Sequence, residues 1–181
     1  MQVGKEEHLN TKIFKDFFEI TKSRLSISVV FSSITGYLLA TETVDTLHIM
    51  YLFIGGFCMV GASNALNQVI ERDYDAVMKR TQNRPIPRGR ISISSALILS
   101  LLMIVMGFYL LYHLNLKTAF FSFFSILIYV SIYTPLKTIT PLSVFVGAFP
   151  GAIPFMLGWV SATNKFGIEP GILFMLQFFW Q

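Results

Sequence analysis

Residues 47–75 read LHIMYLFIGGFCMVGASNALNQVIERDYD, an apolar run that ends in a cluster of polar and acidic side chains. The part Leu47–Leu66 contains no Asp, Glu, Lys or Arg. Its length matches the roughly 20 residues that a helix needs to cross a hydrocarbon core. This stretch therefore predicts a membrane-spanning helix whose last turns carry polar side chains to the membrane surface.

The composition of the whole chain also indicates a membrane protein. Of the 181 residues, 54% are hydrophobic and 13% are charged, whereas a soluble domain is about 25% charged. The 18 Phe residues and the long aliphatic runs exclude a disordered chain, and the single Cys58 excludes a disulfide framework.

Four more apolar runs complete the predicted spans. The five runs are Leu25–Ala40, Leu47–Leu66, Ser95–Tyr112, Thr118–Tyr133 and Leu142–Ser161. A sixth span starts in Gly171–Gln181. We expect an all-α polytopic bundle, with a cytoplasmic N-terminal segment over residues 1–24 and a membrane domain over residues 25–181.

Lys and Arg residues gather on one side of this topology. Of the 14, only Lys117 and Lys165 fall on the opposite side. By the positive-inside rule, the N-terminus and the loops 71–94 and 134–141 are cytoplasmic. The net charge of +4 is therefore a topology signal and does not indicate a nucleic-acid partner.

The polar residues after the second span have helical spacing. At about 100° per residue, one stripe holds Asn64, Asn67, Gln68, Glu71 and Asp75. Asn67, Glu71 and Asp75 are successive i, i+4 neighbours, about 6 Å apart along the axis. Two carboxylates and an amide oxygen in this arrangement can share one hard cation such as Mg²⁺. Asp73 projects from the opposite face, and we interpret it as an ion-pair partner of Arg72 or Lys79.

Five basic residues follow the acids. They are Lys79, Arg80, Arg84, Arg88 and Arg90. Guanidinium groups beside a carboxylate-held Mg²⁺ suit a diphosphate, because both bind phosphate oxygens. The alternative is that the basic residues are topology signals and the acids are their ion-pair partners. The N-x-x-x-E-x-x-x-D spacing favours the metal site, since a solvated loop does not require its amide and acids on one stripe.

A second motif, Y-T-P-L-K, occupies residues 133–137 in the next cytoplasmic loop. Lys137 can reach the same phosphates, and Tyr133 can hydrogen-bond to them or stack near a carbocation. A Tyr and a Lys at this depth are also common as interfacial anchors. Their position on the same side as the first cluster favours a shared site.

These motifs resemble the UbiA-type intramembrane prenyltransferases, whose signature is an Asn and two acids at four-residue spacing with K-R-T-x-x-R-P downstream. Gln68, Glu71 and the continuation M-K-R-T-Q-N-R-P-I-P-R-G-R are similar to the branch that farnesylates haem b. The resemblance extends through Y-T-P-L-K and P-G-A-I-P-F-M-L-G-W at 150–159 to L-Q-F-F-W-Q at the end.

The resemblance implies transfer of a farnesyl group from farnesyl diphosphate to a vinyl group of haem b, giving haem O. It implies that Mg²⁺ is held by Asn67, Glu71 and Asp75, and that the diphosphate-binding residues are Asn64, Lys79, Arg80 and Arg84. Tyr133 and Lys137 close the diphosphate pocket and complete the catalytic set. It also implies a bacterial inner membrane with a cytoplasmic N-terminus. The implied partners are membrane lipid and haem-pathway or oxidase-assembly proteins.

The family fold is a ring of nine helices with a second acidic motif on a later loop. After residue 75 only Glu169 is acidic, and the topology places it on the opposite side. We therefore expect the chain to be the N-terminal part of such a fold, inactive alone. Other hypotheses stay open. They are an aromatic polyprenyltransferase that acts on 4-hydroxybenzoate, an ion or proton transporter with a Glu71–Asp75 relay, and a non-catalytic membrane fragment.

Overall fold

The computed structural model describes residues 13–181, so the predicted segment 1–24 lies partly outside the described residues. Residues 13–20 are helical and lead through a two-residue turn into the first span. The helices are α2 (Ser23–Ala40), α3 (Thr46–Ile70), α4 (Arg72–Val77), α5 (Ile93–Tyr112), α6 (Leu116–Leu127), the π-helix η1 (Ile128–Tyr133), α7 (Thr134–Leu136), α8 (Ser143–Thr163) and α9 (Ile168–Trp180). The expected all-α fold is confirmed, with no strand within residues 13–181.

Five helical segments are long and apolar enough to cross a membrane, as predicted. They are Ser23–Ala40, Thr46–Ile70, Ile93–Tyr112, Leu116–Leu136 and Ser143–Thr163. The second is longer than its predicted apolar run, because the helix continues past Leu66 through Asn67 and Gln68 to Ile70. The expected sixth segment is the 13-residue helix α9.

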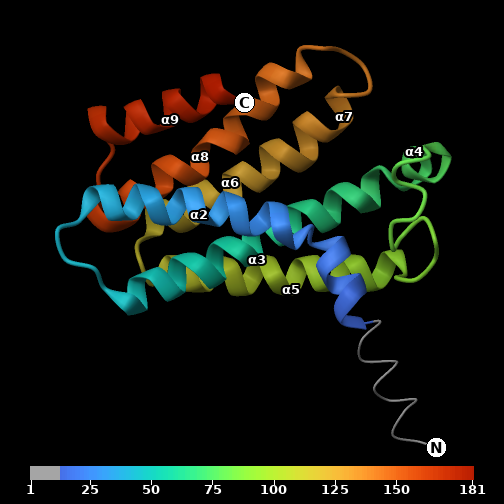
Figure 1. Ribbon diagram of the computed structural model, residues 1–181, viewed down its shortest axis with the longest axis horizontal. Helices are drawn as coiled ribbons and strands as arrows, with labels where there is room; N and C mark the ends of the chain where they lie inside the picture. Colours follow the sequence, from blue (N-terminus) through green and yellow to red (C-terminus); the bar gives the residue numbers. More distant parts are fainter. Residues whose placement is uncertain (1–12) are drawn as a thin grey trace, which may run out of the picture.

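The basic segments share one end of the bundle. Figure 1 shows the start of α2, the loop that carries α4, and α7 at the same end. The α2–α3, α5–α6 and α8–α9 connections lie at the other end. The polar motifs of two loops distant in sequence are therefore neighbours in space.

Small residues allow the helices to approach closely. A methyl group on Gly158 of α8 would collide with the carbonyl oxygen of Ser33 on α2, and one on Gly36 would collide with that of Phe155. Gly55 of α3 and Gly107 of α5 make a similar approach. Because lipid tails are as apolar as the helix surfaces, such close packing is a main source of helix association in membranes.

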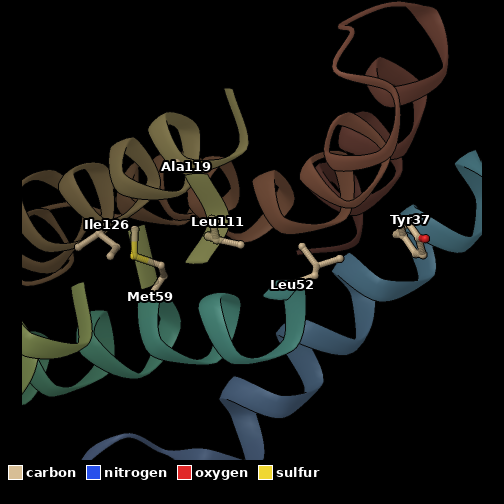
Figure 2. Packing of buried hydrophobic residues seen from close by; sticks show 6 residues of the cluster. All are labelled: Tyr37, Leu52, Met59, Leu111, Ala119 and Ile126. Atoms are coloured by element: carbon tan, nitrogen blue, oxygen red, sulfur yellow. The ribbon is translucent and has the colours of Figure 1, made fainter. Parts of the chain in front are cut away.

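The apolar core lies between α2, α3, α5 and α6. Figure 2 shows one buried cluster, formed by Tyr37, Leu52, Met59, Leu111, Ala119 and Ile126. Large apolar side chains also cover the outside of the bundle, where Leu101 and Leu102 of α5 are 62% and 63% exposed. This outward apolar surface fits a lipid environment.

Candidate functional site

Three polar side chains at the junction of α3 and α4 are buried. Asn67, Glu71 and Asp75 are 1%, 8% and 4% exposed. The helix breaks at Glu71, whose φ and ψ are −88° and 3°. The Glu71 N–H still donates to Asn67 O (3.0 Å), and the Asp75 N–H donates to Glu71 O (2.8 Å). The four-residue spacing therefore survives the break and stacks the three side chains at the membrane edge.

The Asn67 and Glu71 side chains form one network with the second loop. The Asn67 amide nitrogen donates to Glu71 Oε2 at 2.7 Å. Lys137 forms an ion pair with Glu71 Oε1, and its ammonium also lies 3.5 Å from Asn67 Oδ1. The Thr134 hydroxyl lies 3.0 Å from the same Oδ1. The Y-T-P-L-K loop thus meets the first motif directly.

Asp75 forms its ion pair with a different basic residue, Arg84. Arg84 Nη1 lies 2.6 Å from Asp75 Oδ2, and the Thr81 hydroxyl donates to the Asp75 carbonyl at 3.1 Å. The loop that carries Arg84 is held in turn by Arg90, which forms ion pairs with Asp16 and Glu19 in the helix 13–20. Each buried carboxylate is therefore paired with its own basic residue.

The other predicted basic residues lie at the edge. Lys79 and Arg80 are exposed and make no ion pair with any residue in 13–181. Asp73 is exposed, and its carboxylate lies 3.5 Å from Arg72, as its interpretation as an ion-pair partner predicted. Of the predicted diphosphate-binding cations, Arg84 alone contacts a carboxylate of the motif.

The residues of the predicted polar stripe contact two different parts of the chain: Asn67 contacts the Y-T-P-L-K loop, and Asn64 and Gln68 contact residues around the start of α2. The Asn64 amide donates to Thr21 O (3.4 Å) and Ser26 Oγ (3.3 Å), and the Gln68 amide donates to Ile20 O (2.9 Å). On the stripe, Gln68 lies at the edge opposite Asn67 and Asn64 lies between them, and both amides contact residues around the start of α2. Asn64 also lines the central cavity. The two amides therefore fix the turn between helix 13–20 and α2.

That turn contains Lys22, a site residue that sequence reasoning missed. Lys22 has a left-handed backbone (φ 45°), which is uncommon for a residue with a side chain. Burial, and then the like charges of Arg84 and Lys137, lower the pKa of Lys22 to about 8, although Glu71 and Asp75 oppose this shift. In sequence, a lysine directly before an apolar span is indistinguishable from a topology signal.

The π-helix η1 places two tyrosines beside the site. Tyr129 and Tyr133 stack with ring centroids 5.1 Å apart, and Lys137 Nζ lies 5.5 Å from the Tyr133 ring centre. Gly147 of α8 leaves room for the Tyr133 ring, since a methyl group there would lie 2.7 Å from it. The motif predicted Tyr133 but not Tyr129, although their i, i+4 spacing places both tyrosines on one face of a helix.

A cavity of about 440 Å³ opens between α2, α3, α6 and α8. Asn64, Tyr129 and Tyr133 line it near the polar network, and Leu52 and Leu111 line it towards the other end of the bundle. Its lining is mainly apolar. The polar network therefore lies beside an apolar cavity that can take a hydrocarbon chain.

The donor atoms fit a magnesium ion. Within residues 13–181 no group of three His, Cys, Asp or Glu side chains is clustered. The candidate donors are the carboxylates of Glu71 and Asp75 and the amide oxygen of Asn67. Mg²⁺ is normally bound through one or two carboxylates plus phosphate oxygens and water, so a larger carboxylate cluster is not required. The Lys137 ammonium beside Glu71 Oε1 and Asn67 Oδ1 shows that these two oxygens converge on one cationic position.

Fold and site together define an integral, multi-pass membrane protein with a polar site at one end of an apolar cavity. The model of the UbiA prenyltransferase family matches residues 29–181, and the chain belongs to this family. The family expected from the sequence motifs is therefore confirmed.

Curated relatives carry a more specific name. The chain is 62% identical over 172 residues to the protoheme IX farnesyltransferase of Christiangramia forsetii, an alignment that covers 95% of this chain and 57% of the relative. It is 61% identical to the protein of that name from Flavobacterium johnsoniae, over 93% of this chain and 57% of the relative. The chain thus spans 57% of the length of these relatives.

Solved structures show the same fold. A digeranylgeranylglyceryl phosphate synthase superposes with a TM-score of 0.82 at 21% identity, covering 91% of this chain and 58% of the other. A UbiA homologue from Archaeoglobus fulgidus superposes with a TM-score of 0.78 at 15% identity, covering 91% and 61%. At these identities the likeness concerns the fold alone.

Proposed function

We propose that the protein to which this chain belongs transfers a farnesyl group from farnesyl diphosphate to a vinyl group of haem b, giving haem O. The observation that carries the proposal is a buried Glu71–Asp75 site next to an apolar cavity, with Tyr133 in the cavity wall and beside Lys137, the ion-pair partner of Glu71. The 62% identity to a protoheme IX farnesyltransferase supports the choice of substrates. The chain spans 57% of that relative, so the activity is proposed for the complete protein.

We assign the metal site to Asn67, Glu71 and Asp75. Solved UbiA homologues from Archaeoglobus fulgidus were bound to DMAPP and Mg²⁺ or to GPP and Mg²⁺, which supports a metal-bound prenyl diphosphate here. When bound, Mg²⁺ would neutralise the negative charge that develops on the leaving diphosphate.

The basic residues hold the phosphates. Arg84 can offer its guanidinium fork to phosphate oxygens while its other face stays against Asp75. Lys137 can turn from Glu71 to a phosphate oxygen, because its flexible stem reaches both. Lys79 and Arg80, exposed at the rim, steer the anion towards the site.

The reaction breaks the farnesyl C1–O bond, and the diphosphate leaves with the bonding electrons. A vinyl carbon of haem b then attacks C1 and forms a C–C bond. Water adds to the resulting cation and loses a proton, which leaves a hydroxyl group. Tyr129 and Tyr133 present stacked rings to the cavity and stabilise positive charge there. The apolar walls exclude water from the farnesyl cation until the C–C bond has formed.

The competing hypotheses have less support. The names of the curated relatives favour haem over 4-hydroxybenzoate as acceptor. An ion relay through Glu71 and Asp75 has no use for the apolar cavity beside them. We also propose a bacterial inner membrane with a cytoplasmic N-terminus, because the basic segments share one end of the bundle. On this topology haem b reaches the site from the membrane or from a haem-pathway protein.

The acceptor assay tests the proposal. Vesicles that contain the complete gene product are incubated with Mg²⁺, farnesyl diphosphate and either haem b or 4-hydroxybenzoate, and the products are identified by mass. We expect haem O, no prenylated benzoate, and no reaction when Mg²⁺ is removed by a chelator. Prenylation of 4-hydroxybenzoate but not of haem b would contradict the proposed acceptor.

A further inference from the structure

Thr134 connects the two motifs of the site, although its position in the sequence predicts no role for it. It lies between Tyr133 and Lys137 in the Y-T-P-L-K loop, and it is 1% exposed. Its Oγ1 lies 3.0 Å from Asn67 Oδ1, the oxygen that we assign to the metal. A buried hydroxyl in this position acts on a metal through the ligand that it contacts.

The π-helix explains how Thr134 reaches Asn67. The Thr134 N–H donates to the Tyr129 carbonyl five residues earlier, and Thr134 Oγ1 lies 2.8 Å from the same carbonyl. The hydroxyl has one hydrogen and two neighbouring acceptors. Because the N–H already satisfies the Tyr129 carbonyl, the hydroxyl hydrogen is available to Asn67 Oδ1.

The contacts of Asn67 select one orientation of its amide group. The amide nitrogen donates to Glu71 Oε2, while Oδ1 faces the Thr134 hydroxyl and the Lys137 ammonium. A flipped amide would place Oδ1 against the Glu71 carboxylate and its NH₂ group against the ammonium. A cation that replaces Lys137 at Oδ1 would leave the Thr134 hydroxyl as the remaining donor to that oxygen.

We propose that Thr134 is a positioning residue, which holds the Asn67 amide with Oδ1 directed at the cation and so sets the affinity for the metal–diphosphate pair. This inference rests on the proposed function, because it takes Asn67 as a metal ligand. Loss of an outer-shell hydrogen bond to a metal ligand typically weakens metal binding about 10- to 100-fold.

The test measures binding of Mn²⁺, a spectroscopic substitute for Mg²⁺, to the complete gene product in the presence of farnesyl diphosphate. Thr134→Val keeps the shape and removes the hydroxyl, and we expect the Kd for Mn²⁺ to rise about 10- to 100-fold. Thr134→Ser keeps the hydroxyl and should bind nearly as the wild type does.

The matched control is Ser100→Ala. Ser100 is fully buried, and its hydroxyl donates to the Ala96 carbonyl at 2.8 Å within α5, outside the cavity lining. Removal of this buried hydroxyl should leave Mn²⁺ binding unaltered. A second check is Asn67→Asp. Its two carboxylate oxygens are equivalent, so no side-chain orientation has to be fixed by Thr134. In that background, Thr134→Val should weaken binding little further.

The outcomes separate the two proposals. If Glu71→Gln abolishes binding but Thr134→Val binds as the wild type, the positioning role is wrong and the site stands. An equal loss in Thr134→Ser and Thr134→Val, or an undiminished loss in the Asn67→Asp background, would also overturn the positioning role. If wild-type protein binds no Mn²⁺ with farnesyl diphosphate, the proposed function itself fails.

Discussion

Lys137 and Glu71 form an ion pair that joins two loops separated by two spans, and the same ammonium lies 3.5 Å from Asn67 Oδ1. A divalent cation bound to these two oxygens has to displace the ammonium. We therefore expect Lys137 to oppose binding of the metal alone and to assist binding of the metal together with a diphosphate, since the displaced ammonium can then move to a phosphate oxygen.

Substitution Lys137→Met should change metal and diphosphate binding in opposite directions. Without diphosphate, Mn²⁺ should bind more tightly than to the wild type, because the competing charge is gone. With Mn²⁺ present, farnesyl diphosphate should bind more weakly, because a phosphate contact is lost. Calorimetric titrations measure both constants. Lys117→Met, on the other side of the membrane, is the control, and weaker binding of Mn²⁺ alone to Lys137→Met would contradict the competition.

Removal of Arg84 should destabilise the fold as well as weaken substrate binding. Asp75 is buried, and its carboxylate lies 2.6 Å from Arg84, so Arg84→Ala leaves a buried charge without its partner. The expected cost is about 3 kcal/mol, measured by unfolding in detergent. Asp75→Asn should restore most of that stability in the double variant, but not diphosphate binding. Arg88→Ala changes an exposed arginine and should have little effect on either; equal losses there would make the effect nonspecific.

Diphosphate affinity should fall as the pH rises through about 8, the lowered pKa of Lys22. Burial and the charges of Arg84 and Lys137 lower this pKa, while Glu71 and Asp75 raise it. Protonated Lys22 attracts the anion below that pH, and neutral Lys22 does not above it. For folding, the charged Lys22 costs stability below about pH 8, and this cost is relieved as the pH rises from about 8 to the usual pKa of 10.5, so stability rises across that window. Lys22→Arg stays charged and should abolish this step in a titration of Kd against pH. An unchanged step would exclude Lys22.

The close contact between α2 and α8 should tolerate no added methyl group. Gly158→Ala would drive a Cβ into the Ser33 carbonyl, and we expect a loss of about 1–3 kcal/mol. Gly171→Ala, on α9, meets no atom within 4 Å and should be neutral or slightly stabilising. Thermal unfolding of the two variants tests this. Equal melting temperatures would show that the α2–α8 contact is looser than described.

The spans were predictable because a membrane imposes one simple requirement, a long apolar helix. Leu47–Leu66 meets that requirement without any knowledge of its neighbours. The i, i+4 spacing also predicted that Asn67 and Glu71 meet, since that contact is local. The helix nevertheless continues past Leu66 to Ile70, because polar residues such as Asn67 and Gln68 keep helical backbone hydrogen bonds.

Contacts between distant segments were not predictable. Nothing in the sequence indicates that Asn64 and Gln68 bind the turn before α2, or that Lys22 in this turn is near enough for Glu71 and Asp75 to affect its pKa. The π-helix before Thr134 was not predicted from the sequence either. A stripe on one helix predicts which residues share a face, but not which neighbour each edge of that face contacts.

The most direct test of the account is haem O formation by the complete gene product with Glu71→Gln, Asp75→Asn and Asp73→Asn. The first two variants remove a buried carboxylate from the assigned metal site, whereas Asp73 is an exposed partner of Arg72 with a side chain 81% exposed. We predict that Glu71→Gln and Asp75→Asn lose Mg²⁺-dependent haem O formation while Asp73→Asn keeps it. Wild-type activity in either of the first two variants would contradict the assigned site.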